Sequence, residues 1–214
     1  MKIYCVGYRS WALQIYENLK KTTKHKFKII KNKKKISLKE ISTFNPDYIL
    51  FYGWSNKIPI NIINKYFCVM LHPSPLPKFR GGSPLQNQII RNIKSSKITL
   101  FKMEKKLDAG PIILTRKFSL EGHLNEIFNR LTVIGTKLTL KFFKNNFKLK
   151  KQNDKIATYF KRRKPEESEI TLSEIKNKSS KYLINKIRML EDPYPNAFIK
   201  TKDGKKLKIK NAEI

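Results

Sequence analysis

Residues 67–84 read FCVMLHPSPLPKFRGGSP. The first five are all apolar, which predicts a strand buried on both faces of a sheet. From His72 to Pro84, prolines and a glycine pair follow so closely that we expect neither helix nor strand. In open α/β sheets, ligands bind at the carboxyl ends of the central strands. This stretch therefore predicts both a fold class and the position of a functional site.

Apolar segments alternate with helical patterns on both sides of this stretch. Before it we expect strands at residues 2–7, 26–31 and 47–52, helices around 11–19 and from Pro59 onward, and a charged loop at 33–35. After it we expect a helix from Ser83 to about Arg91, strands at 97–104 and 111–118, and a long helix at 123–146. Strands separated by helices form βαβ units, which predict a parallel sheet covered on both faces.

The composition changes near residue 147. Residues 147–179 are polar and interrupted by Pro165, which favours a linker, and a short helix is expected at 180–190. A hairpin about Asp203-Gly204 is expected in 197–213. We therefore predict an α/β protein with an open, mostly parallel twisted sheet in a catalytic core of residues 1–146. A linker at 147–179 and a small C-terminal α+β region at 180–214 follow it.

The net charge leaves two explanations open. The 214 residues carry 47 Lys and Arg against 16 Asp and Glu, a formal net charge of +31. Only eight of the basic residues are Arg, whereas planar phosphate recognition favours Arg. A compositional bias toward Lys on solvated faces explains this balance, and so does the attraction of a polyanionic substrate. A nucleotide sugar, a polyglutamylated cofactor and tRNA are all such substrates.

Other features of the composition point to a cytoplasmic protein. No stretch approaches the roughly 20 apolar residues that a membrane span needs, so we expect no membrane partner. The N-terminal residues lack the features of a signal peptide. The two cysteines, Cys5 and Cys68, lie in apolar runs, which fits buried thiols in a reducing compartment.

His72 is the first candidate for acid–base chemistry, because it opens the Pro/Gly loop directly after the apolar strand. A structural histidine is the alternative. Asp108, in a turn beside Gly110, is the best carboxylate partner unless it serves the turn alone. We expect one helix and one strand to bring that turn to the same sheet edge as His72. No second His, Cys or carboxylate stands at ligand spacing, so no metal is expected.

The stretch HPSPLPKFRGGSPLQNQI, together with LDAGPI at residues 107–112, resembles the tetrahydrofolate-dependent formyltransferases. Residues 157–160, 162–166 and 192–197 are similar to the linker and C-terminal region of the enzymes that formylate tRNA and amino sugars. The resemblance implies a Rossmann-like core that transfers a formyl group from 10-formyltetrahydrofolate to a primary amine. His72 and Asp108 match the family's catalytic His and Asp.

One position departs from the family pattern. The family has an Asn two residues before the catalytic His, and this chain has Met70 there. Met cannot donate a hydrogen bond to the oxyanion, and losing one such donor costs about 10²–10³ in rate. Gln86 or Asn87 could supply the amide, or the enzyme could work more slowly with His72 alone. The third possibility is a folate-binding protein without catalytic activity.

The resemblance also implies which residues bind the two substrates. Those expected to hold the pterin of the folate are Trp54, Ile58, Met70, Leu107, Gly110 and Ile112. Those expected to bind the acceptor are Ser74, Arg80, Gly81 and Gly82. The glycines let backbone approach a substrate closely, and Arg80 could hold a phosphate or carboxylate.

Three functions follow from these observations. The favoured acceptor is the amino group of a nucleotide-linked amino-dideoxysugar, because the region after residue 155 is smaller than we expect for the tRNA enzymes. The alternatives are a methionyl-tRNA formyltransferase and a non-catalytic folate-binding homologue. A homodimer is compatible with each of them.

Overall fold

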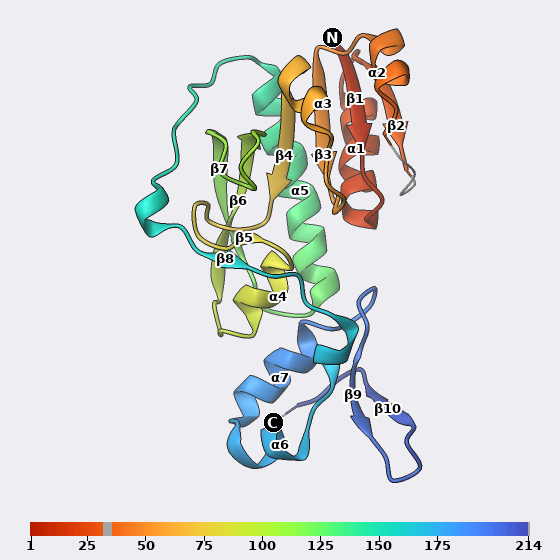
Figure 1. Ribbon diagram of the computed structural model, residues 1–214, viewed down its shortest axis with the longest axis vertical. Helices are drawn as coiled ribbons and strands as arrows, with labels where there is room; N and C mark the ends of the chain where they lie inside the picture. The colour runs from red at the N-terminus through yellow and green to blue at the C-terminus, as the bar shows by residue number, and fades with distance from the viewer. Residues whose placement is uncertain (32–35, 214) are drawn as a thin grey trace.

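The computed structural model describes residues 1–31 and 36–213 (Figure 1). The charged loop predicted at 33–35 lies outside the described residues. Six strands form the main sheet, in the order β2-β1-β3-β4-β6-β7. They are β1 (Lys2–Val6), β2 (Lys26–Ile30), β3 (Tyr48–Tyr52), β4 (Cys68–His72), β6 (Ser95–Lys102) and β7 (Ile112–Ser119).

The sheet confirms the predicted α/β class. The pairs β1–β2, β1–β3 and β3–β4 are parallel, whereas β4–β6 and β6–β7 are antiparallel. Alternate residues of β1 enter two separate hydrophobic clusters, Ile3 and Cys5 on one face and Tyr4 and Val6 on the other. This division explains why the inner strands read as continuous apolar runs, since both faces of the sheet are buried.

Helices cover both faces of the sheet. The helices α1 (Ser10–Thr22) and α5 (Leu124–Phe143) pack on one face, with their apolar residues in the larger cluster. The short helices α2 (Leu38–Phe44) and α3 (Ile60–Lys65) contribute Ile41 and Ile62 to the cluster on the other face. The helix α4 (Pro84–Ile89) follows the Pro/Gly loop.

The structure corrects the predictions for the Pro/Gly loop and for 147–179. His72 is the last residue of β4 and does not follow it. Within the loop, β5 (Arg80–Gly81) pairs in parallel with β8 (Tyr159–Phe160), because the linker passes beside it. The linker also contains the 3-10 helices Asp154–Ile156 and Pro165–Ser168 and the helix α6 (Leu172–Asn177). Thr171 and Glu174 form a capping box at α6, a signal that the sequence carried.

The small C-terminal α+β region extends beyond α4, away from the sheet (Figure 1). It contains α7 (Ser180–Arg188) and a hairpin of β9 (Ala197–Lys200) and β10 (Lys206–Ile209). The helix α6 lies beside α7, where Lys186 Nζ is 2.7 Å from Glu174 Oε2. Arg188 Nη1 donates to the Leu120 and Gly122 carbonyls at 2.6 and 2.7 Å, and His123 Nδ1 lies 2.8 Å from Glu191 Oε1. These bonds hold the region against the start of α5.

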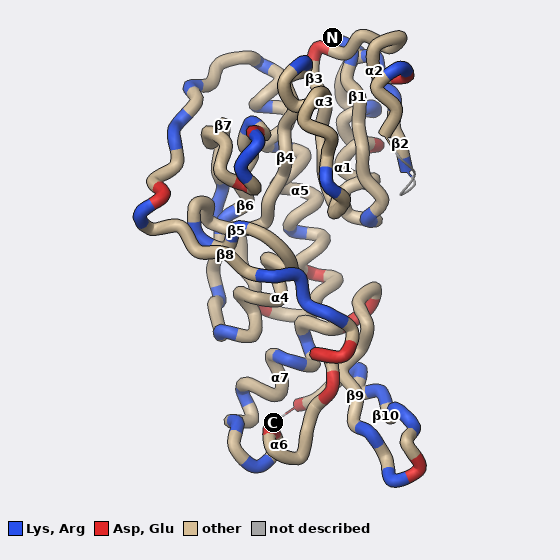
Figure 2. The backbone as a smooth tube through the Cα atoms, viewed as in Figure 1, with Lys and Arg blue, Asp and Glu red and all other residues tan. Residues whose placement is uncertain are grey.

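Basic residues are spread over nearly every element, and one continuous run, residues 161–164, passes beside α4 (Figure 2). Within the described residues, no helix is both long and apolar enough to cross a bilayer.

The hydroxyl of Tyr16, on α1, joins the ends of two strands, β1 and β3. It accepts the Tyr52 N–H at 2.8 Å and lies 3.0 Å from the carbonyl oxygens of Val6 and Leu50. Burial raises the pKa of Tyr16, so the hydroxyl keeps its proton and can donate to one of the two carbonyls. The carboxyl ends of β1 and β3 are therefore tied together where the sheet borders the loops.

Replacement of Tyr16 by Phe should lower the free energy of unfolding by about 1–3 kcal/mol, because the Tyr52 N–H would stay buried without an acceptor. Urea denaturation measures this change. Tyr48→Phe is the control, since its hydroxyl is exposed and makes a long hydrogen bond of 3.4 Å to Asn145 Oδ1. It should cost less than about 0.5 kcal/mol. Equal effects would show that the Tyr16 hydroxyl does not tie the strands.

Candidate active site

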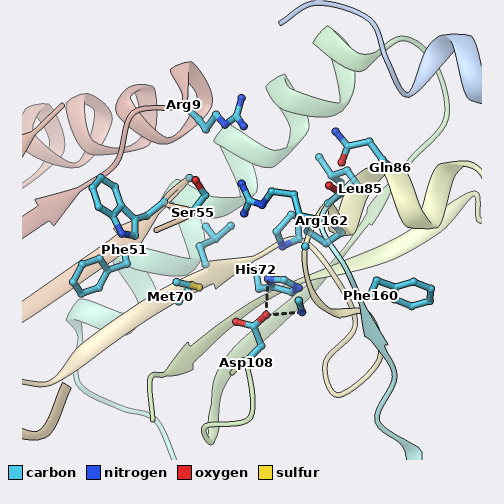
Figure 3. A pocket seen from close by; sticks show the side chains of 18 of the residues that line it. Arg9, Phe51, Ser55, Met70, His72, Leu85, Gln86, Asp108, Phe160 and Arg162 are labelled. Atoms are coloured by element: carbon cyan, nitrogen blue, oxygen red, sulfur yellow. Dashed lines mark hydrogen bonds and ion pairs between the residues drawn. The ribbon is translucent and has the colours of Figure 1, made fainter. Parts of the chain in front are cut away.

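A cavity of about 530 Å³ opens at the carboxyl ends of β1, β3 and β4. Met70 and His72 are two residues apart on β4, so their side chains point to the same face of the sheet. Both line the cavity, as does Asp108 from the loop between β6 and β7 (Figure 3). The cavity therefore lies where the sequence predicted a functional site.

The His72 ring has a defined tautomer in this arrangement. Its Nε2 lies 2.8 Å from the Phe79 carbonyl oxygen, which can only accept, so Nε2 carries a proton. Its Nδ1 is 3.8 Å from Asp108 Oδ2. His72 and Asp108 are only 5% and 7% exposed. A neutral ring therefore has its lone pair on Nδ1, the nitrogen nearer to Asp108.

Asp108 reaches His72 by a route that differs from the predicted one. Because β6 is antiparallel to β4, it ends at Lys102 beside Val69, near the start of β4. The loop that follows must run back along the sheet to place Asp108 near His72, at the other end of that strand. Asp108 has a left-handed φ of 49°, and its Oδ2 accepts the Gly81 N–H at 2.8 Å. The expected crossover to the same sheet edge is therefore wrong, although the two residues do meet.

Gln152, which the sequence did not single out, holds the Asp108 loop. Its Nε2 donates to the Asp108 carbonyl at 3.0 Å and to the Gly110 carbonyl at 2.7 Å. Its Oε1 accepts from Nε and Nη2 of Arg80 at 3.1 and 2.7 Å. Only the residue types are visible in the sequence, because Gln152 becomes adjacent to this loop through the path of the linker.

Arg80 is fully buried and does not line the cavity. Besides Gln152, its guanidinium contacts Asp154 Oδ1 at 2.8 Å and the Tyr159 hydroxyl at 2.5 Å. Hydrogen bonds from Lys106 and Arg80 lower the pKa of Asp154. The structure therefore joins Arg80 to the linker. Its guanidinium lies outside the cavity, so we do not propose it as a ligand of the acceptor.

The structure brings eight of the fourteen predicted site residues to the cavity wall. They are Trp54, Met70, His72, Gly81, Gly82, Gln86, Leu107 and Asp108. The other six, all within the described residues, lie elsewhere: Ile58, Ser74, Arg80, Asn87, Gly110 and Ile112. Asn87 donates to the Gly82 carbonyl at 3.0 Å and lines a second cavity beside Arg91. Of the two amides proposed to replace the family Asn, only Gln86 lines the cavity with His72.

Four of the other residues that line the cavity were not predicted and carry polar or charged groups. They are Tyr8 and Arg9 from the turn after β1, Arg162 from the linker and Tyr194 from the C-terminal region. Arg162 and Tyr194 lie in segments that resemble the family, which was the available signal. Tyr8 and Arg9 belong to the Gly7-Tyr-Arg9 turn. The sequence gives no signal that this turn lies near Arg162 and Tyr194, because the fold brings them together.

The cavity wall also contains an unsatisfied donor. Trp54 Nε1 is buried and has no hydrogen-bond partner among the described residues. Because a buried unpaired N–H costs free energy, a polar ligand atom at this wall would be stabilised. No group of three His, Cys, Asp or Glu residues that could hold a metal ion occurs in the part of the chain that the structure describes.

Comparisons with known proteins identify the class to which this fold and site belong. The family described as Formyl transferase matches residues 9–132. The chain belongs to this formyl transferase family.

Relatives that carry more specific names are similar to most of this chain. The methionyl-tRNA formyltransferase of Lachnospira eligens is 34% identical over 185 residues, which is 83% of this chain and 57% of that relative. The chain thus spans little more than half the length of this curated relative. The solved structure of a methionyl-tRNA formyltransferase from Clostridium thermocellum is 35% identical, with a TM-score of 0.85, over 98% of this chain and 97% of that one.

A sugar N-formyltransferase from a Shewanella species shares the fold. It has a TM-score of 0.77 over 100% of this chain and 98% of that one, at 17% identity. At that identity the likeness concerns the fold alone.

The replacement Gln152→Ala should lower the free energy of unfolding by about 2–4 kcal/mol, because it removes the acceptor of Nε and Nη2 of the buried Arg80 and the donor to two carbonyls. Thermal or urea denaturation measures the loss. Asn153→Ala is the matched control, since its side chain is exposed and accepts only the Lys155 N–H at 3.0 Å. A Gln152 variant as stable as this control would show that the hydrogen bonds of Gln152 do not contribute to the free energy of unfolding.

Proposed function

We propose that the protein transfers a formyl group from 10-formyltetrahydrofolate to a primary amine, with His72 and Asp108 as its catalytic residues. The observation that carries this proposal is the buried His72–Asp108 pair in a cavity with an apolar wall and a basic wall. The folate supplies the formyl carbon, and this chain's residues bind, orient and move protons.

His72 can serve as the base that the amine requires. An attacking amine must lose a proton, and Nδ1 of His72 has a lone pair because Nε2 is the protonated nitrogen. The resulting cation would form next to Asp108 Oδ2, which is 3.8 Å from Nδ1 in the structure. Asp108 in turn is fixed by the Gly81 N–H. The pair can therefore take up the amine proton without leaving an unpaired charge inside the protein. It can return that proton to the folate nitrogen as the bond from that nitrogen to the formyl carbon breaks and the bond to the amine nitrogen replaces it.

Negative charge develops on the formyl oxygen as the amine attacks, and it needs donors. Met70 provides none. The carboxamide side chains on the cavity wall, within the described part of the chain, are Asn56 and Gln86. We assign the donor role to Gln86, since it is 5% exposed and held on α4. His72 remains a second donor once it is protonated.

The apolar wall fits the pterin of the folate. Trp54, Met70 and Leu107 line it, together with Phe51. The free Nε1 of Trp54 supplies a donor of the kind that a pterin oxygen or ring nitrogen accepts. These residues would hold the donor on the Met70 side of His72.

Methionyl-tRNA is the acceptor that the comparisons support. The relatives at 34% and 35% identity both carry that name, and this reverses the order of acceptors favoured by the sequence analysis. A nucleotide-linked amino sugar remains the second candidate, because Arg9 and Arg162 make a compact basic wall within the cavity itself. We place either reaction in the cytoplasm, where folates and both acceptors are made.

Product mass spectrometry tests the proposal. The protein is mixed with 10-formyltetrahydrofolate and either initiator methionyl-tRNA or UDP- and dTDP-linked 4-amino sugars. We expect a formyl group on the methionyl-tRNA. Formylation of the sugars alone would overturn the tRNA assignment, and no product with retained tetrahydrofolate binding would overturn the catalytic proposal.

His72→Asn and Asp108→Asn should each lower kcat by about 10²–10⁴-fold, the range that general acid–base catalysis contributes. Initial rates at saturating substrate measure the change, and circular dichroism checks that both variants fold. His25→Asn is the control, because His25 packs against Phe27 and Phe143, away from the cavity. A rate within threefold of wild type in either variant would remove that residue from the mechanism.

Met70→Asn should raise kcat, by up to about 10²-fold, because an amide beside His72 adds a donor for the formyl oxygen. Met70→Leu keeps the shape without the donor and should leave kcat unchanged. Single-turnover rates separate chemistry from product release. An unchanged rate in Met70→Asn would contradict this expectation and would mean that Gln86 already supplies the whole donor function.

A further inference from the structure

Two of the eight arginines in this chain, Arg9 and Arg162, line the catalytic cavity. They come from segments that are far apart in the sequence, the turn before α1 and the linker. Figure 3 shows both side chains on the side of His72 opposite to Asp108. Two guanidinium groups therefore share the cavity with His72, on the side of the ring away from its carboxylate partner.

These two guanidinium groups are not neutralised by the protein. Within the residues that the structure describes, neither Arg9 nor Arg162 forms an ion pair with a carboxylate, whereas Arg80 does so with Asp154 at 2.8 Å. Arg9 instead lies over the rings of Tyr8 and Tyr194, at 5.2 and 5.3 Å from their centroids. An aromatic face holds a guanidinium in place without cancelling its charge.

The charges of Arg9 and Arg162 both act on Tyr194. Burial raises the pKa of its hydroxyl, while the Gln86 amide beside it and the positive charges of Arg9 and Arg162 act in the opposite direction. Both guanidinium groups and this phenol therefore line the same cavity.

The backbone of Arg162 is fixed by contacts on both sides. The Gly82 N–H donates to the Phe160 carbonyl at 2.8 Å, and the Arg163 N–H donates to Ser83 Oγ at 3.1 Å. A Cβ at Gly82 would lie 2.3 Å from the Arg162 Cα, so a glycine is required for this approach. The Arg162 side chain is thus presented to the cavity from a rigid position.

We propose that Arg9 and Arg162 form a phosphate-binding clamp for the acceptor, next to the amine that His72 deprotonates. The clamp rests on the proposed function, and it narrows the acceptor to an amine that carries a phosphate ester or diphosphate. Guanidinium groups bind phosphate oxygens through two parallel hydrogen bonds, which fixes orientation as well as affinity. The phosphate would belong to a nucleoside diphosphate or to the terminal phosphodiester of a tRNA.

Isothermal titration calorimetry with inorganic pyrophosphate tests the clamp at about 0.15 M salt, where the general positive field is largely screened. We expect pyrophosphate to bind to the wild-type protein. Its affinity for Arg9→Gln and for Arg162→Gln should each be at least about tenfold lower. Arg116→Gln is the matched control, since it removes the same charge from an exposed position on β7. It should bind like wild type. No binding to wild type, or equal binding to all four proteins, would overturn the clamp.

Competing ligands then distinguish the two phosphate sources. UDP and the trinucleotide CCA are titrated into the same proteins. A loss of about tenfold or more in Arg9→Gln and Arg162→Gln for either ligand supports the clamp and identifies the source. The clamp would be overturned if both variants bound UDP and CCA as tightly as wild type does. It would also be overturned if the variants bound tetrahydrofolate more weakly but still bound pyrophosphate like wild type. These measurements need no turnover, so an inactive protein that binds pyrophosphate through the two arginines would contradict the proposed function and leave the clamp intact.

Discussion

The buried guanidinium of Arg80 organises the surroundings of the His72–Asp108 pair. A charge with no solvent exposure must find all its partners inside the protein, and Arg80 finds them in Gln152, Asp154 and Tyr159. All three lie on the linker, so the linker has to lie against the Pro/Gly loop. Because Gln152 also donates to the Asp108 carbonyl, the same charge fixes the loop that carries the carboxylate.

This arrangement explains why linker and loop pair as short strands. With Arg80 anchored, the pairing of β5 with β8 sets the position of Gly81, whose N–H binds the Asp108 carboxylate. The same pairing carries the chain on to Arg162 at the cavity wall. Residues of the linker thus position both the His72–Asp108 pair and the basic wall of the cavity, although the sequence of the linker is that of a polar connection.

The sequence predicted what depends on local pattern and missed what depends on long-range pairing. The apolar run ending in His72 and the alternation of strands and helices were sufficient for the fold class. The sequence did not predict that β6 runs antiparallel to β4, because the direction of a strand depends on its pairing and leaves no local signal. Arg80 was misplaced for a similar reason, since its burial depends on Gln152, 72 residues away.

The arginines and lysines of this chain contribute differently to its charge. The lysines are spread over almost every element and create a broad positive field, which salt screens. Most arginines have specific local partners, such as the Asn87 carbonyl for Arg91 and the Leu120 carbonyl for Arg188. Arg9 and Arg162 share this fixed placement but keep their charge available in the cavity. The net charge of +31 can therefore draw any polyanion to the surface, while the choice of acceptor rests with two guanidinium groups beside His72.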